Sequence, residues 1–177
     1  MSALAVHVVF EHGADGQPFG SAYARLLRPL THPGVRDRAR ATFGTDYDGR
    51  PVDVVIVDPL WCPDVSAAKV ERLLGAARAA GARVVHALDD NFPDLVRERP
   101  GWASADQVAA LERLLAGADG LVVTTEPLAE RYRAYHDAVV VVPNALDERL
   151  ISTGRVARWR SRRAWRTWLG QLRRPGR

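Results

Sequence analysis

The sequence has a single cysteine, no long apolar run and no acidic residue beyond Glu148. One cysteine excludes an intramolecular disulfide and a cysteine-based metal cluster within the chain, and Cys62 has no identifiable base beside it, so we expect a half-buried structural residue. No stretch of 18 apolar residues is present to cross a membrane, and the N-terminus lacks the basic start of a signal peptide. These absences predict a cytoplasmic location.

The charges are distributed unevenly along the chain. Residues 1–150 carry a formal charge of −5, whereas residues 151–177 hold nine arginines and no acid. The high isoelectric point, about 9.8, therefore comes from the C-terminal segment. Because residues 1–150 are mildly acidic, they offer no basic surface for nucleic acid, and specific nucleic-acid binding is not expected.

Strand-like and helix-like segments alternate through the 177 residues, of which 47% are hydrophobic. This pattern predicts an α/β fold: a Rossmann-like, doubly wound, mostly parallel six-stranded sheet in a single domain over residues 1–150. The default strand order for such a sheet is 3-2-1-4-5-6. The expected strands are residues 4–10, 38–43, 52–57, 82–88, 121–125 and 138–142. The expected helices are residues 21–28 capped by Ser21, a helix that Asp64 or Ser66 opens and that ends at Gly81, residues 104–117 capped by Ser104, and residues 126–135.

The apolar segment 82–88 ends in two adjacent carboxylates, Asp89 and Asp90. Asn91 and Pro93 follow them, so we expect the strand to break there into a loop. In open α/β sheets, ligands bind at the carboxyl ends of the strands, which makes this pair the first candidate for chemistry. The alternative is an ordinary Asx-rich turn that only terminates the strand.

Residues 20–30, 88–92 and 118–147 form three segments that, in this order, resemble the N-terminal half of a GT-B glycosyltransferase of the large retaining, nucleotide-sugar-dependent group. Residues 20–30 are similar to the loop and helix that follow the first strand and face the interdomain cleft. Residues 88–92 resemble the aspartate-rich turn of one branch of the group. Residues 118–147, with the Val-Pro-Asn turn at 142–144, are similar to the segment that leaves the N-terminal domain. The resemblance spans about residues 4–150.

The resemblance implies a domain that supplies the acceptor side of a sugar-transfer site in polysaccharide or glycoconjugate synthesis. Its partners would be a sugar acceptor and, through a separate donor-binding domain, a nucleotide-sugar; the chain alone would be inactive. Asp89 and Asp90 would contact the acceptor as catalytic residues, and Pro143 and Asn144 would form the interdomain turn. The residues assigned to the acceptor or phosphate loop are His12, Gly13, Gly16, Gly20, Ser21 and Asn91.

No metal and no cofactor is expected at this site. Adjacent side chains such as Asp89 and Asp90 tend to diverge on an extended segment, and no further ligand is identifiable. The glycines of residues 13–20 do not fit a dinucleotide fingerprint, which disfavours a nicotinamide dehydrogenase.

Several alternatives stay open. The domain as a whole could be a non-catalytic binding domain or a vestigial one. His86 fits a satisfied core histidine better than a base, and Asn144 could simply stabilise its turn. Trp61 could line a cleft or cap the core.

After Leu150 the sequence departs from the GT-B pattern, as if truncated before the donor-binding domain. Residues 151–177 form an Arg/Trp-rich basic tail in which tryptophans and leucines recur at helical spacing. This tail suits a peripheral contact with an anionic membrane surface at the inner face of the membrane. Nonspecific nucleic-acid binding and a frameshifted end are the other two interpretations.

Overall fold

The computed structural model describes residues 2–145 and 147. The chain divides into two units, Met1–Ala145 and Leu146–Arg177, and the fold described below belongs to the first. The tail predictions for residues 151–177 lie outside the described residues.

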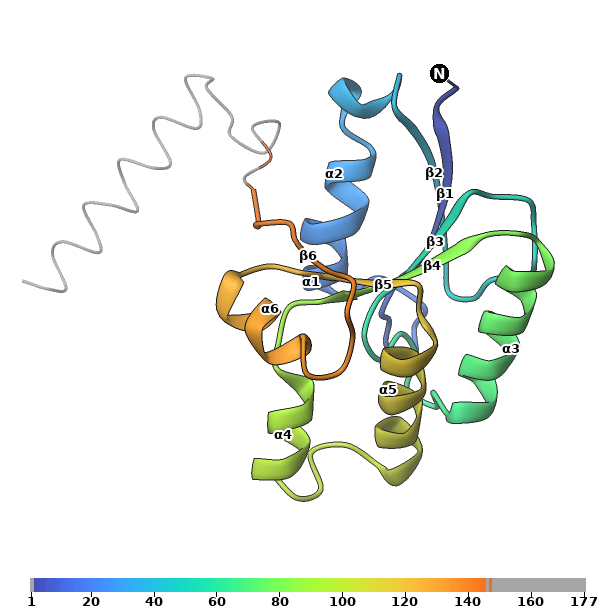
Figure 1. Ribbon diagram of the computed structural model, residues 1–177. Coiled ribbons are helices and arrows are strands. Elements are labelled where there is room, and N and C mark those ends of the chain that lie inside the picture. Colours follow the sequence, from blue (N-terminus) through green and yellow to red (C-terminus); the bar gives the residue numbers. More distant parts are fainter. Residues whose placement is uncertain (1, 146, 148–177) are drawn as a thin grey trace, which may run out of the picture. The chain divides into compact units, whose positions relative to one another are not determined.

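A six-stranded, all-parallel sheet forms the centre of the first unit, in the order β2-β1-β3-β4-β5-β6 (Figure 1). This arrangement confirms the predicted Rossmann-like α/β fold. The strands are β1 (Leu4–Val9), β2 (Ala39–Gly44), β3 (Val54–Val57), β4 (Arg83–Leu88), β5 (Gly120–Val123) and β6 (Val139–Val141).

Helices cover both faces of the sheet, as a parallel sheet requires (Figure 1). One face packs against a single broken helix made of α1 (Gly20–Ala22), η1 (Tyr23–Leu27) and α2 (Arg28–Leu30), followed by the short turn η2 (Pro33–Val35). The other face packs against α3 (Ala67–Ala79), α4 (Phe92–Glu98), α5 (Ala105–Gly117) and α6 (Glu126–Tyr132). The larger of the two cores lies on this second face.

The strand order differs from the default order 3-2-1-4-5-6, because β3 pairs with β1 rather than with β2. Strand β3 reads Val-Val-Ile-Val, and both Val55 and Val57 are completely buried, so it belongs inside the sheet. Strand β2 is only partly buried and takes the edge position beside β1. The crossovers from β1 and from β3 consequently run over opposite faces, and the sheet has its topological switch point between these two strands.

Strand β4 ends at Leu88 as predicted, but the loop that follows covers only residues 89–91, and helix α4 begins at Phe92. The Asn91 side chain caps it by accepting a hydrogen bond from the backbone N–H of Asp94, 3.3 Å away. Pro93 lies in the first turn, where its missing N–H breaks no helical hydrogen bond. The proline that predicted the end of the strand therefore also lies in the first turn of a helix that was not predicted.

The first helix also differs from its prediction. The N-cap is Phe19, which makes no side-chain capping bond, so Ser21 lies one residue inside the helix. Residues Tyr23–Leu27 form a π-helical turn in its middle. By contrast, Ser104 caps α5 as predicted, through a complete capping box with Gln107, and Ser66 rather than Asp64 caps α3.

No helix within the described part of the chain is long and apolar enough to cross a membrane.

Candidate functional site

Three neighbouring strands of the sheet are each followed by an acidic residue. Asp58 directly follows β3, Asp89 directly follows β4, and Glu11 lies two residues beyond β1. Because the strands are parallel and adjacent, these acids meet at the carboxyl edge of the sheet. The backbone N–H of Glu11 donates a hydrogen bond to Oδ2 of Asp58 at 3.1 Å. This bond links the segments that follow β1 and β3 at the topological switch point.

Arg25 is the cation of this acidic edge. Its Nη1 lies 3.1 Å from Oδ2 of Asp89 and 3.7 Å from Oδ1 of Asp58. The residue sits in the middle of the π-helical turn, a rare geometry that recurs at functional sites. The side chain of Arg25 is only 9% exposed and that of Asp58 is 1% exposed, so both charges are withdrawn from solvent.

The ion pairs leave some hydrogen-bonding capacity unused. Nη1 of Arg25 and Oδ1 of Asp58 are buried and have no hydrogen-bond partner among the described residues. Native proteins pair the great majority of their buried polar atoms, and an unpaired one costs stability. The two unpaired atoms belong to groups that face each other, and each lowers the stability of the protein at this edge of the sheet.

The same crowding changes the proton affinities of the carboxyl groups. Burial, reinforced by the charges of Asp58 and Asp89, raises the pKa of Glu11 to about 7. Burial also raises the pKa of Asp58 to about 6, although the Glu11 N–H and the Arg25 charge partly oppose the shift. Carboxyl groups with a pKa near neutrality are suited to accept and release a proton at physiological pH.

A cavity of about 600 Å³ opens beside this cluster, between the broken helix and strands β3 to β5. Its lining is mostly apolar with a few polar side chains, which is the usual construction of a small-molecule site. Arg25 and Asp89 belong to its wall. The other lining residues are Ser21, Ala24, Leu26, Pro29, Leu30, Ile56, Ala87, Val122, Thr124, Val142, Pro143, Asn144 and Ala145.

Four of the predicted site residues line this cavity: Ser21, Asp89, Pro143 and Asn144. Asp90, in contrast, is exposed and contributes its backbone carbonyl, which accepts a hydrogen bond from the Tyr132 hydroxyl at 2.7 Å.

Asn91 and the loop of residues 13–20 lie outside the cavity wall. The Asn91 side chain is engaged with Asp94 at the start of α4. His12 pairs with Pro18 in an isolated antiparallel bridge and holds the Gly13 carbonyl through Nδ1 at 2.7 Å. Gly16 turns the loop with a φ of 69°, a conformation that favours glycine.

His86 departs from the expectation of a satisfied core histidine. It is completely buried in β4, between Val57 and Leu121 of the neighbouring strands. Neither ring nitrogen has a hydrogen-bond partner within the described residues, and burial together with the Arg25 charge lowers its pKa to about 3. The ring is therefore neutral and is held by packing alone.

Cys62 and Trp61 belong to the core. Trp61 is fully buried, which decides between its two interpretations in favour of packing. Cys62 is also buried, and burial raises the pKa of its thiol to about 11, so the thiolate that a nucleophile needs is scarce at neutral pH.

Sequence reasoning missed Glu11, Arg25 and Asp58. The signal for the two acids was present, since each follows a strand as Asp89 does. What was lacking was the strand order that places β1, β3 and β4 side by side. Arg25 carried no comparable signal, because the direction in which its side chain points depends on the π-helical turn.

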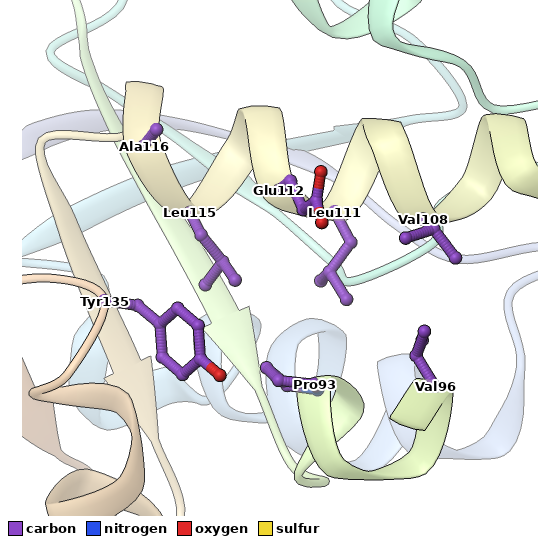
Figure 2. Close-up of a pocket in the computed structure, with 8 residues that line it drawn as sticks. All are labelled: Pro93, Val96, Val108, Leu111, Glu112, Leu115, Ala116 and Tyr135. Carbon is purple, nitrogen blue, oxygen red and sulfur yellow. The ribbon is translucent and has the colours of Figure 1, made fainter. Parts of the chain in front are cut away.

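A second hollow, of about 260 Å³, lies between α4 and α5 (Figure 2). Side chains of the two helices face one another across it, with the Tyr135 ring at one end. Glu112 is the only charged residue in its wall. Its apolar lining lacks the convergent polar groups of the cavity beside Arg25.

Within the described residues, no group of three or more histidine, cysteine or acidic side chains is placed to hold a metal ion. Comparison of the chain with protein-family models, with curated proteins and with solved structures finds no match.

Proposed function

We propose that this domain binds the sugar acceptor of a glycosyl transfer reaction in the cavity beside Arg25 and Asp89. The domain then supplies the acceptor side of the transfer site in polysaccharide or glycoconjugate synthesis. A nucleotide-sugar donor is held by a separate donor-binding domain. The reaction belongs to the two parts together, and neither part transfers sugar alone.

One observation supports this proposal most. The three segments that resemble a GT-B glycosyltransferase are far apart in the sequence, yet nearly the whole cavity wall comes from them. Residues 21–30, Asp89 and residues 122–145 contribute every lining residue except Ile56 and Ala87. Segments chosen for their resemblance thus surround a single cavity.

The chemistry of the wall fits a sugar. Apolar lining residues such as Ala87 and Val122 suit the C–H face of a pyranose ring, and the polar side chains of the lining suit its hydroxyl groups. The Asp89 carboxylate is held by Arg25 and keeps further lone pairs with which to accept a hydrogen bond from an acceptor hydroxyl. Orientation of that hydroxyl beside the anomeric carbon is the task of an acceptor site.

The test is ligand-observed NMR with the full chain and methyl glycosides of the common hexoses as probes. We expect millimolar binding that is lost in Ala24→Trp, because Ala24 is an exposed residue of the cavity wall and the indole would fill the space. The matched control is Ala79→Trp, at an exposed position on α3, and it should bind as the parent does. If no glycoside binds, or if Ala24→Trp binds normally, the proposal is wrong.

A further inference from the structure

Asp58 is buried behind the cavity wall and does not line the cavity. Its side chain is 1% exposed, whereas Arg25 and Asp89 belong to the lining. Nη1 of Arg25 lies 3.7 Å from Oδ1 of Asp58 and 3.1 Å from Oδ2 of Asp89. The guanidinium therefore lies between two carboxyl groups, of which only that of Asp89 can meet a ligand in the cavity.

The two oxygens of Asp58 have different surroundings. Oδ2 accepts a hydrogen bond from the backbone N–H of Glu11 at 3.1 Å, which holds the carboxyl group in place. Oδ1 is buried and accepts no hydrogen bond from the described residues, and its ionic contact is with Arg25. A buried carboxylate oxygen without a donor is costly, and a nonpolar residue would avoid that cost. The presence of Asp58 therefore requires an explanation other than stability.

We propose that Asp58 is a positioning residue of the acceptor site, which acts through Arg25 to orient the Asp89 carboxylate and to keep it a strong hydrogen-bond acceptor. This inference rests on the proposed function and describes how the same site is regulated. With Asp58 ionised, the positive charge of Arg25 is shared between two carboxylates, so Asp89 keeps more of its negative charge for an acceptor hydroxyl. Since Arg25 engages Oδ2 of Asp89, Oδ1 is the oxygen left for that hydroxyl.

Protonation of Asp58 is expected to weaken the acceptor site. A neutral Asp58 attracts the guanidinium less, and Arg25 then neutralises Asp89 alone. Burial raises the pKa of Asp58 to about 6, so this change falls between pH 5 and pH 7.5. Affinity for a neutral sugar should therefore rise with pH over this range, and binding should release a proton from Asp58.

The other titratable groups around this cluster can be separated from Asp58. Glu11 titrates in the same range, because burial raises its pKa to about 7. Asp90 is exposed and lies outside the cavity wall. His86 stays uncharged between pH 5 and pH 7.5, because burial and the Arg25 charge lower its pKa to about 3. Glu11 is the group that could imitate the expected pH dependence, and Glu11→Gln removes its titration but keeps its backbone N–H.

The experiment measures the affinity of the full chain for methyl glucoside, methyl galactoside and methyl mannoside by NMR titration at pH 5 and pH 7.5. For the sugar that binds best, we expect about fivefold tighter binding at pH 7.5, the difference between a charged hydrogen-bond acceptor and a largely neutralised one. Asp58→Asn keeps the shape of the side chain and should bind at both pH values as weakly as the parent does at pH 5. Glu11→Gln and the exposed control Asp37→Asn should keep the pH dependence of the parent.

A second measurement needs no ligand and follows the side chain of Arg25. The NMR signals of its guanidinium nitrogens are identified by their loss in Arg25→Met. They should shift with a midpoint near pH 6 in the parent and in Glu11→Gln, and they should not shift in Asp58→Asn. If Asp58→Asn does not fold, the parent and Glu11→Gln decide both measurements.

Affinity that is equal at the two pH values overturns the inference and leaves the proposed function standing. The same holds if the pH dependence persists in Asp58→Asn, or if it is lost in Glu11→Gln, because Asp58 would then not be its source. Guanidinium signals of the parent that do not respond to pH also reject the link between Asp58 and Arg25. Failure of every glycoside to bind at either pH overturns the proposed function together with the inference.

Discussion

The hydroxyl of Tyr132 donates a hydrogen bond to the backbone carbonyl of Asp90 at 2.7 Å. It also accepts one from the backbone N–H of Phe92 at 3.2 Å. Tyr132 is completely buried on α6, forty residues farther along the chain. One side chain thus fixes the turn that carries Asp89, and a helix that contributes nothing to the cavity wall holds a site residue in place.

Tyr132→Phe removes only this hydroxyl. The Asp90 carbonyl and the Phe92 N–H then lose their partner, and we expect the free energy of unfolding to fall by about 1–3 kcal/mol. Urea denaturation provides the measurement. Tyr135→Phe, at a neighbouring exposed tyrosine, is the control and should change stability by less than about 0.5 kcal/mol. Equal stability of the two variants would show that the hydroxyl does not anchor the turn.

Most of the fold could be predicted because its elements carry local signals. Apolar runs mark β3 and β4, and serine caps mark α3 and α5, so each element is specified by its own residues. The strand order could not be predicted in this way. The order depends on how much surface each strand buries. Both β2 and β3 pair with β1, and only a comparison of their burial shows that β3 lies inside the sheet and β2 at its edge.

The site was harder to predict than the fold for a related reason. Asp89 and Asp90 attract attention because they are adjacent in the sequence, yet only Asp89 lines the cavity. Glu11, Arg25 and Asp58 come from three different segments and acquire their roles by proximity in space. Such a constellation is invisible until the strands are placed side by side.

Arg25→Met tests the buried ion pairs. The variant leaves Asp58 without its cation, and loss of one partner of a buried pair costs about 3 kcal/mol when the other stays charged. Since the pKa of Asp58 is already raised to about 6, the carboxyl group escapes this cost by protonation in acid. We expect the loss of stability to be large at pH 8 and much smaller at pH 5.

The control for Arg25→Met is Arg133→Met, which breaks a solvent-exposed pair with Glu126. Exposed pairs contribute about 0–1 kcal/mol, so this variant should change stability little at either pH. Denaturation curves at the two pH values decide the outcome. A loss that does not depend on pH would indicate that Arg25 acts through packing rather than charge.

His86→Leu should stabilise the protein in acid. The pKa of His86 is lowered to about 3, so as pH falls below about 6.5 the unfolded chain takes up a proton that the folded chain refuses. Stability attributable to His86 is therefore lost progressively between pH 6.5 and pH 3, and leucine does not titrate. We expect the advantage of the variant to be about 2 kcal/mol larger at pH 4.5 than at pH 7.5. Parallel stability curves over this range would contradict the assignment.

Glu11→Gln should have the opposite pH dependence. The folded-state pKa of Glu11, about 7, lies above its ordinary value, so the folded protein binds this proton more tightly than the unfolded chain does. The stability contributed by the protonated group is present in acid and is lost as pH rises from about 4.5 to 7. We therefore expect Glu11→Gln to unfold at a higher temperature than the parent at pH 8, by about 2–4 °C, and at a similar temperature at pH 5. A thermal melt of Glu130→Gln, which should match the parent at both pH values, controls for the loss of one surface charge.

Asp89 and Asp90 can be separated by their effect on transfer. If the proposed function holds, the chain alone should transfer no sugar, because a separate donor-binding domain would hold the donor diphosphate. With a donor-binding domain and its nucleotide-sugar added, Asp89→Asn should lower the transfer rate by about 100-fold, as for a positioned acid–base group. Asp90→Asn should have a smaller effect, because its side chain is exposed and lies outside the cavity wall.

Asparagine also serves in an Asx turn, so a residue that only ends the strand would tolerate either change. A rate within a few-fold of the parent for Asp89→Asn would leave this aspartate with that turn role alone, and the acceptor would then have to be oriented by other polar residues that line the cavity, Ser21, Thr124 and Asn144.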